Sequence, residues 1–141
     1  MRFFNTEGPV DCVRHYCLPP LSRLDMDDVM SLIAQQKYFL LHAPRQTGKT
    51  TCLLALADYL NAGEEYHAVY ANIETAQAAR EDVALGMADV AWKIARSATQ
   101  QLHDAVAEPL AQTMIGATPP TTLVETFLSR WCEQLDKPLV L

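Results

Sequence analysis

The stretch that decides the fold lies between residues 38 and 51 and reads Tyr38-Phe39-Leu40-Leu41-His42-Ala43-Pro44-Arg45-Gln46-Thr47-Gly48-Lys49-Thr50-Thr51. Its first five residues are β-prone and apolar on both faces, which is typical of a buried parallel strand. A helical pattern follows, with an apolar face formed by Leu53, Leu56, Ala57 and Leu60. Gly63 is well placed to end this helix. The stretch therefore predicts a strand, a loop and a helix in that order.

The loop in this stretch has the pattern of a phosphate-binding P-loop. The pattern is Gly, four residues and Gly-Lys-Ser/Thr between a strand and a helix, and here it reads Ala43-x4-Gly48-Lys49-Thr50. Gly48 lets the backbone approach a phosphate closely, and Lys49 reaches the β- and γ-phosphates as a point charge. The Thr50 hydroxyl is a ligand for Mg²⁺. Ala43 replaces the first glycine, and a small residue is tolerated there if its backbone is not left-handed.

The pattern predicts a site for the phosphates of a nucleotide and for Mg²⁺, and it does not separate ATP from GTP. Backbone N–H groups of the turn form an anion nest, and the helix adds the positive end of its dipole. Thr51 follows Thr50 and is a candidate contact for the α-phosphate. Arg45 is expected to face either phosphate or solvent. The predicted nucleotide-binding residues are Ala43, Pro44, Arg45, Gln46, Thr47, Gly48, Lys49, Thr50 and Thr51.

The rest of the chain predicts further helices and strands in alternation. We expect helices over 26–36, 77–100, 101–113 (interrupted by Pro109) and 122–134, and strands over 67–73 and from 139 onward. Asp25 is the expected N-cap of the first helix, and Thr122 with Glu125 forms a capping-box pattern. This order predicts the α/β class, a P-loop NTPase with a parallel sheet flanked by helices.

The stretch 38–51 resembles the Walker A region of a bacterial family of AAA-like P-loop ATPases. Three other segments are also similar to that family: His15-Tyr16-Cys17-Leu18-Pro19-Pro20-Leu21, Tyr70-Ala71-Asn72-Ile73-Glu74 and Ala78-Ala79-Arg80-Glu81-Asp82. The resemblance runs over most of the chain, and its Pro-Arg-Gln-Thr-Gly-Lys-Thr core is more specific than a bare Walker A. It implies a sheet of five strands, ATP and Mg²⁺ binding, and ATP hydrolysis.

Hydrolysis also needs a Walker B strand that ends in an acid, which holds Mg²⁺ and orients the attacking water. The resemblance implies that this strand is Leu139-Val140-Leu141, so the chain is expected to stop before the acid, with about three strands of the expected five. Glu74 is the weak candidate for a substitute catalytic acid. Asn72 is a candidate for coupling the site to a partner, although a simple turn at the strand end is favoured. Whether the chain is an enzyme, an ATPase in the family's sense, is left open.

Composition excludes several classes of function. The chain has 141 residues and a formal net charge of −6, so bulk electrostatic binding to nucleic acid is disfavoured. Its apolar runs are far shorter than the roughly 20 residues that span a bilayer. With no export signal, we expect four reduced thiols and a cytoplasmic location. The predicted domains are an extended N-terminal arm over 1–24 and the N-terminal part of an ATPase domain over 25–141, truncated before Walker B.

Two alternatives to an ATP-binding fragment of an AAA-like ATPase stay open. A small P-loop kinase uses the same loop, but it needs an arginine-rich lid, and residues 76–118 contain only three basic side chains, Arg80, Lys93 and Arg96. A non-catalytic interaction fragment is the other, because an incomplete sheet exposes an edge and an apolar face. These interpretations predict three possible partners: a nucleotide, a second copy of the chain, or a missing C-terminal half.

Overall fold

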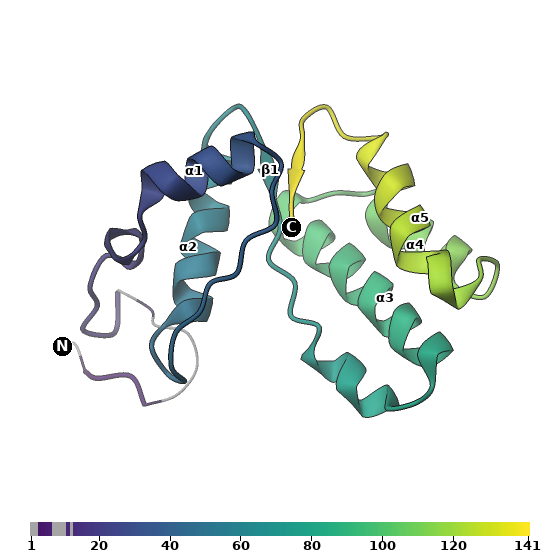
Figure 1. The fold of residues 1–141 in the computed structure, drawn as a ribbon, viewed down its shortest axis with the longest axis horizontal. Helices are drawn as coiled ribbons and strands as arrows, with labels where there is room; N and C mark the ends of the chain where they lie inside the picture. Colours follow the sequence, from purple (N-terminus) through teal and green to yellow (C-terminus); the bar gives the residue numbers. More distant parts are fainter. Residues whose placement is uncertain (1–2, 7–10, 12) are drawn as a thin grey trace. The chain divides into compact units, whose positions relative to one another are not determined.

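The computed structural model describes residues 3–6, 11 and 13–141. The chain divides into two compact units, Met1–Ala62 and Gly63–Leu141. Among the described residues about 55% are helical and 4% are in strands, and Figure 1 shows the helices along the chain. Within these ranges, no helix is both long enough and apolar enough to cross a membrane. The Gly8-Pro9 turn signal in the predicted arm and Cys12 lie outside the described residues.

The first unit contains the 3-10 helix η1 (Pro20–Arg23) and the helices α1 (Met26–Ala34) and α2 (Lys49–Ala62). The Asp25 cap predicted for α1 is confirmed, because the Asp28 N–H donates to Asp25 Oδ1 at 3.2 Å. Acidic side chains in the first turn also suit the positive end of the helix dipole.

Helix α2 buries three of the four residues of its predicted apolar face, whereas Leu53 is only partly buried. Its buried residues are Cys52, Leu56, Ala57 and Leu60. It packs against η1, and the Cys52 thiol lies 3.3 Å from the Pro20 carbonyl oxygen. The helix ends at Ala62, directly before Gly63, as the sequence predicts. The packing brings η1 beside the first turn of α2, where the P-loop pattern lies.

The second unit is built on the helices α3 (Val83–Leu102), α4 (Ala107–Met114) and α5 (Pro120–Cys132). Helix α3 packs against both α4 and α5 (Figure 1). The alanine bias of this region explains how the helices pack, since Ala91, Ala95 and Ala98 of α3 are completely buried. Small side chains allow neighbouring helices to approach closely while their larger residues fill the space between them.

The largest buried side chains of the second unit come from α5. Phe127 and Trp131 are fully buried, and their rings stack with centroids 5.9 Å apart. The indole Nε1 of Trp131 donates to Asp104 Oδ2 at 3.0 Å. The other oxygen of that carboxylate accepts from the N–H groups of Val106 and Ala107, each at 2.7 Å. Asp104 therefore ties the start of α4 to the core residue of α5.

A short parallel pair of strands joins the ends of the second unit. Strand β1 (His67–Ala68) pairs with β2 (Leu139–Val140), with His67 opposite Leu139. The last backbone hydrogen bond of this pairing runs from the Val69 N–H to the Val140 carbonyl oxygen at 2.9 Å, and the Tyr70 backbone bonds to the Gln101 side chain. The Tyr70 N–H donates to Gln101 Oε1 at 2.9 Å, and Gln101 Nε2 donates to the Tyr70 carbonyl oxygen at 2.7 Å. The amide of Gln101 thus takes the place of a strand residue.

The predicted α/β class, a P-loop NTPase sheet flanked by helices, is wrong. The described residues are mostly helical, with a single sheet of two strands, each two residues long. Residues 38–42 have no regular secondary structure and pair with no strand among the described residues, and the strand predicted over 67–73 is limited to His67–Ala68. A strand forms only where a neighbour accepts its backbone hydrogen bonds, and β2 offers β1 only two residues.

The predicted helix boundaries also need correction. The helix expected over 77–100 begins only at Val83, because Asp82 caps it through the Leu85 N–H at 2.9 Å. The residues before it form the 3-10 helix η2 (Glu74–Ala79). Pro109 does not interrupt α4, since it lies in the first turn, where no intrahelical donor is needed. The predicted capping box of Thr122 and Glu125 is wrong, because the N-cap of α5 is Pro119.

The described cysteines depart from expectation at one residue. Cys52 is a buried free thiol and Cys132 is a free thiol at an exposed position, so these two agree with the expected reduced state. Cys17 is disulfide-bonded, so the expectation of four reduced thiols is wrong at that residue.

The Asp104 carboxylate makes the second unit sensitive to acid. Partial burial raises the pKa of Asp104, but the hydrogen bond from Trp131 lowers it. The N–H groups of Ala107 and Val106 and the charge of His67 lower it further, and the net pKa lies below its ordinary value. A depressed folded-state pKa stabilises the fold above the unfolded pKa, about 4, and this stabilisation is lost as the pH falls through the folded value.

We therefore expect Asp104→Asn to make the stability of the protein depend less on pH in acid. The wild-type urea midpoint should fall steeply as the pH drops below about 4, and the Asp104→Asn midpoint should fall less, because Asn does not titrate. Urea titrations of both proteins by circular dichroism across the pH range measure this. Asp58→Asn, at an exposed site on α2, is the matched control and should keep the wild-type slope. Parallel pH curves for wild type and Asp104→Asn would contradict the assignment.

Candidate phosphate-binding loop

The candidate site is the loop of residues 43–48 and the first turn of α2, all within the first unit. The ammonium of Lys49 lies against the beginning of this loop. Lys49 Nζ donates to the carbonyl oxygens of Ala43 and Pro44, each at 2.7 Å. An ammonium group has three N–H donors, so these hydrogen bonds leave one for a ligand.

Two residues of the loop have left-handed backbone. Gly48 has φ +82° and Gln46 has φ +59°. Glycine adopts this conformation without strain, but glutamine does so at a cost. The Thr47 hydroxyl donates to the Pro44 carbonyl oxygen at 2.8 Å, which closes the turn between them. Strained backbone held in place by such contacts is typical of ligand-binding segments.

Helix α2 begins directly after Gly48, as the P-loop pattern predicts. The first backbone hydrogen bond of its first turn runs from the Cys52 N–H to the Gly48 carbonyl oxygen at 2.9 Å. The N–H groups of Lys49 and Thr50 precede that bond, so helix geometry gives them no intrahelical acceptor. The Thr50 side chain is exposed. The loop and the helix start therefore place backbone donors, an ammonium and a hydroxyl within one short segment.

Arg23 is a contributor to the loop that the sequence reasoning missed. It is the last residue of η1, and its guanidinium Nη1 donates to the Thr47 carbonyl oxygen. A Cβ built on Gly48 would lie 3.0 Å from the same nitrogen. Arg23 precedes the contacted Thr47 by 24 residues, so no local sequence pattern signals the contact. Only the packing of η1 on α2 reveals it.

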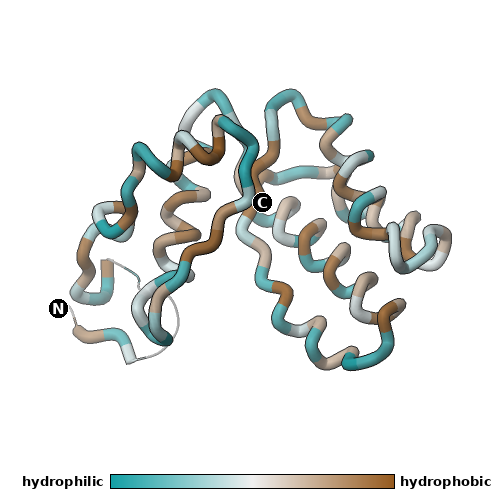
Figure 2. The backbone as a smooth tube through the Cα atoms, viewed as in Figure 1, coloured by the Kyte–Doolittle hydropathy of each residue, from teal (hydrophilic) through white to brown (hydrophobic). Residues whose placement is uncertain are grey.

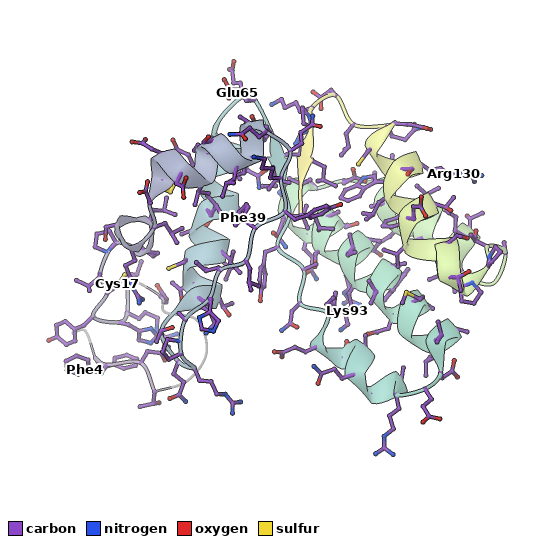
Figure 3. All side chains as sticks on the ribbon, in the orientation of Figure 1. Phe4, Cys17, Phe39, Glu65, Lys93 and Arg130 are labelled. Atoms are coloured by element: carbon purple, nitrogen blue, oxygen red, sulfur yellow. The ribbon has the colours of Figure 1, made fainter. Side chains whose placement is uncertain are left out.

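A pocket of about 240 Å³ opens on the Arg23 side of the loop. Its lining includes Tyr16, Leu18, Pro20, Arg23, Gly48 and Thr51. Figure 3 labels Cys17, which lies between two of these residues in the sequence. The pocket therefore combines apolar side chains from the chain before η1 with the glycine and the helix start of the P-loop pattern.

The remaining predicted residues are divided between the two units. Pro44, Arg45 and Gln46 are exposed at the tip of the loop, and among the described residues the Arg45 side chain has no hydrogen-bond or ion-pair partner. Glu74 belongs to the second unit, where it begins η2. Its N–H donates to Asn72 Oδ1 at 2.9 Å, so this pair forms the simple turn that was favoured for it.

The charge of the described loop is positive. Across residues 3–6, 11 and 13–141, the recorded ion pair joins His67 and Asp136 of the second unit, and none involves Lys49 or Arg23. In the same ranges, no three His, Cys, Asp or Glu side chains gather where they would hold a metal ion. The side chains present therefore suit an anion, and a cation would have to arrive with it.

Comparisons with family models, with curated proteins and with solved structures found no match to this chain.

Proposed function

We propose that residues 43–51 bind the phosphate groups of ATP together with Mg²⁺. The observation that carries this proposal is the position of Lys49, whose Nζ lies 2.7 Å from both the Ala43 and the Pro44 carbonyl oxygens. The lysine thereby spans the loop whose end is the left-handed Gly48, at the N-terminus of a 14-residue helix. The sequence resemblance to AAA-like ATPases supports the choice of nucleotide.

The loop offers a polyphosphate three kinds of attraction. Lys49 supplies a full positive charge and its third N–H donor. The N–H groups at the start of α2 and the positive end of its dipole add directed hydrogen bonds to an anion. Gly48 presents no side chain, so the backbone can approach a phosphate oxygen closely.

Magnesium fits this site as a companion of the phosphates. Mg²⁺ usually keeps several waters and takes one or two protein ligands beside substrate phosphates, and the exposed Thr50 hydroxyl provides one such oxygen. When bound, the ion neutralises phosphate charge. Hydrolysis is left out of the proposal, because within the described residues of the first unit no carboxylate bonds to Lys49 or Thr50.

Thr50→Val is expected to weaken ATP binding only when Mg²⁺ is present. Valine keeps the shape of threonine but removes the hydroxyl, so the dissociation constant should rise about tenfold in Mg²⁺. In EDTA the two proteins should bind ATP equally. Isothermal titration calorimetry in both buffers measures the difference, with Thr121→Val, at an exposed position on α5, as the matched control. An equal loss in EDTA would show that Thr50 does not act through the metal.

Self-association is a second candidate function, because one apolar segment of the first unit is left open. Residues 38–42 have no regular secondary structure and form no backbone hydrogen bond within the described structure. Tyr38 is 105% and Leu40 is 87% exposed, and the tube is coloured as hydrophobic here in Figure 2. Phe39, labelled in Figure 3, is 39% exposed. We propose that two copies pair along this uncharged, β-prone segment, as unprotected strand edges do.

Tyr38→Lys combined with Leu40→Lys is expected to convert a dimer into a monomer. Lysine on a strand edge opposes pairing through charge repulsion and through its hydration. Sedimentation velocity of wild type and variant at high protein concentration measures the mass. Val83→Lys combined with Leu85→Lys changes residues of α3 that are also exposed, and it should leave the dimer intact. A wild-type monomer at every concentration would end this second proposal.

The cytoplasmic location is proposed from the sequence, in keeping with a nucleotide ligand. No contact among the described residues favours the small-kinase alternative.

A further inference from the structure

Arg23 lies at the proposed phosphate-binding loop, and no carboxylate among the described residues pairs with it. Among the described residues it forms no ion pair, and its recorded contact is the hydrogen bond to the Thr47 carbonyl oxygen. A guanidinium has five N–H donors in a rigid fork, and among the described residues only the Thr47 carbonyl oxygen is recorded as an acceptor for them. The side chain is also exposed, which leaves those donors within reach of a ligand.

The position of this guanidinium is specific to the glycine of the loop. Arg23 Nη1 would lie only 3.0 Å from a Cβ at Gly48, so the absence of a side chain at Gly48 lets the arginine reach the loop. The space that a P-loop glycine leaves for phosphate is thus bordered by a second cation. Arg23, Gly48 and Thr51 also line the same pocket of about 240 Å³.

We propose that Arg23 is a second phosphate-binding cation of this loop, and that it exchanges the Thr47 carbonyl for phosphate oxygens when a polyphosphate binds. The inference rests on the proposed function of residues 43–51. A neutral carbonyl is a weaker acceptor than a phosphate oxygen, because a charged pair forms shorter and stronger hydrogen bonds. The guanidinium fork suits two phosphate oxygens at once, which a lysine ammonium does not.

The two cations approach a ligand from different elements. Lys49 lies on the inner side of the loop, against Ala43 and Pro44. Arg23 comes from η1 and meets the opposite end of the loop at Thr47 and Gly48. Together they place positive charge at both ends of the short segment where a chain of phosphates would lie, and this arrangement favours polyphosphates over a single phosphate.

The test uses inorganic tripolyphosphate as the probe, since it carries the phosphates without a nucleoside. In isothermal titration of the full chain, Arg23→Gln should weaken tripolyphosphate binding by about tenfold or more, and Arg23→Lys should recover part of the loss. Arg96→Gln, at an exposed position on α3, is the matched control and should bind as wild type does. Inorganic monophosphate should bind weakly to all four proteins and show little dependence on Arg23.

A second measurement needs no folded variant. The side-chain Nε–H signal of Arg23 in a ¹⁵N–¹H spectrum of the wild-type protein should move on saturation with tripolyphosphate, while the Arg96 signal stays in place. An unmoved Arg23 signal, or full affinity in Arg23→Gln alongside a loss in Lys49→Ala, would overturn the role of Arg23 and leave the loop's function standing. If wild type binds neither tripolyphosphate nor ATP, the proposed function itself fails.

Discussion

Lys49→Ala is expected to weaken the binding of Mg·ATP about 100-fold. The substitution removes the positive charge of the loop and the two hydrogen bonds, each 2.7 Å long, that hold the Ala43 and Pro44 carbonyls. A hydrogen bond to a charged group contributes about 1.5–3 kcal/mol, and each 1.4 kcal/mol changes the dissociation constant about tenfold. The lost ligand contact and the loosened loop together predict a loss of about 100-fold.

Isothermal titration calorimetry with Mg·ATP compares three proteins for this prediction. Lys37→Ala is the matched control, because it removes an exposed lysine of the same unit and should leave the affinity unchanged. Circular dichroism should show the helices retained in both variants, since Lys49 lies in the first turn of α2 and is not among the buried residues of that helix. Equal affinities for wild type and Lys49→Ala would remove the ammonium from the proposed site.

Trp131→Ala is expected to destabilise the second unit more than any surface change. Trp131 is fully buried, stacks on Phe127 and donates to Asp104 Oδ2 at 3.0 Å. Truncating a buried tryptophan to alanine lowers the free energy of unfolding by about 3–5 kcal/mol, because it removes apolar contacts and leaves a cavity. The change also removes one of the hydrogen bonds that hold the carboxylate at the start of α4.

Urea titration followed by circular dichroism measures this loss. Trp131→Phe keeps most of the ring packing but loses the indole N–H, so its cost should be smaller, with about 1 kcal/mol of it from the hydrogen bond. Leu85→Ala changes a residue of α3 that is 58% exposed and should shift the free energy by less than about 0.5 kcal/mol. A loss in Trp131→Ala no larger than in Leu85→Ala would contradict the assigned core.

The local features of the fold could be predicted where a single segment determines them. The cap at Asp25 and the buried face of α2 depend on neighbours within a few residues; the cap is confirmed, and so are three of the four residues predicted for that face. The burial of Phe127 and Trp131 follows from helical spacing in the same way. Such features depend on local geometry, so the sequence carries enough information to place them.

The sheet could not be predicted, because a strand depends on distant partners. Tyr38 to His42 has the composition of a buried strand, but no described segment of its unit pairs with it. The strand at His67 is short because β2 pairs with only two of its residues, and the Tyr70 backbone bonds to the Gln101 side chain. Sequence periodicity predicts neither the missing partner of residues 38–42 nor the short length of β1, because both depend on tertiary contacts.

The pattern predicted the loop before α2 and the start of that helix, but it did not predict the contact of Arg23. Gly48, Lys49 and Thr50 lie together at the start of α2, as predicted. The contact of Arg23 with this loop arises from the packing of η1 on α2, which lies beyond the reach of a motif. A motif can therefore locate a candidate loop, but it does not predict which distant residues contact that loop.

Backbone amide spectra of the wild-type chain during titration with Mg·ATP test the central claim most directly. We predict that the amide signals of Gly48, Lys49 and Thr50 shift together and saturate at one ATP per chain, because their N–H groups turn to phosphate oxygens. Signals of the α3 helix should stay in place. Amides of this loop that remain unmoved at saturating Mg·ATP, or shifts confined to other residues, would contradict the assignment of residues 43–51 as a phosphate-binding loop.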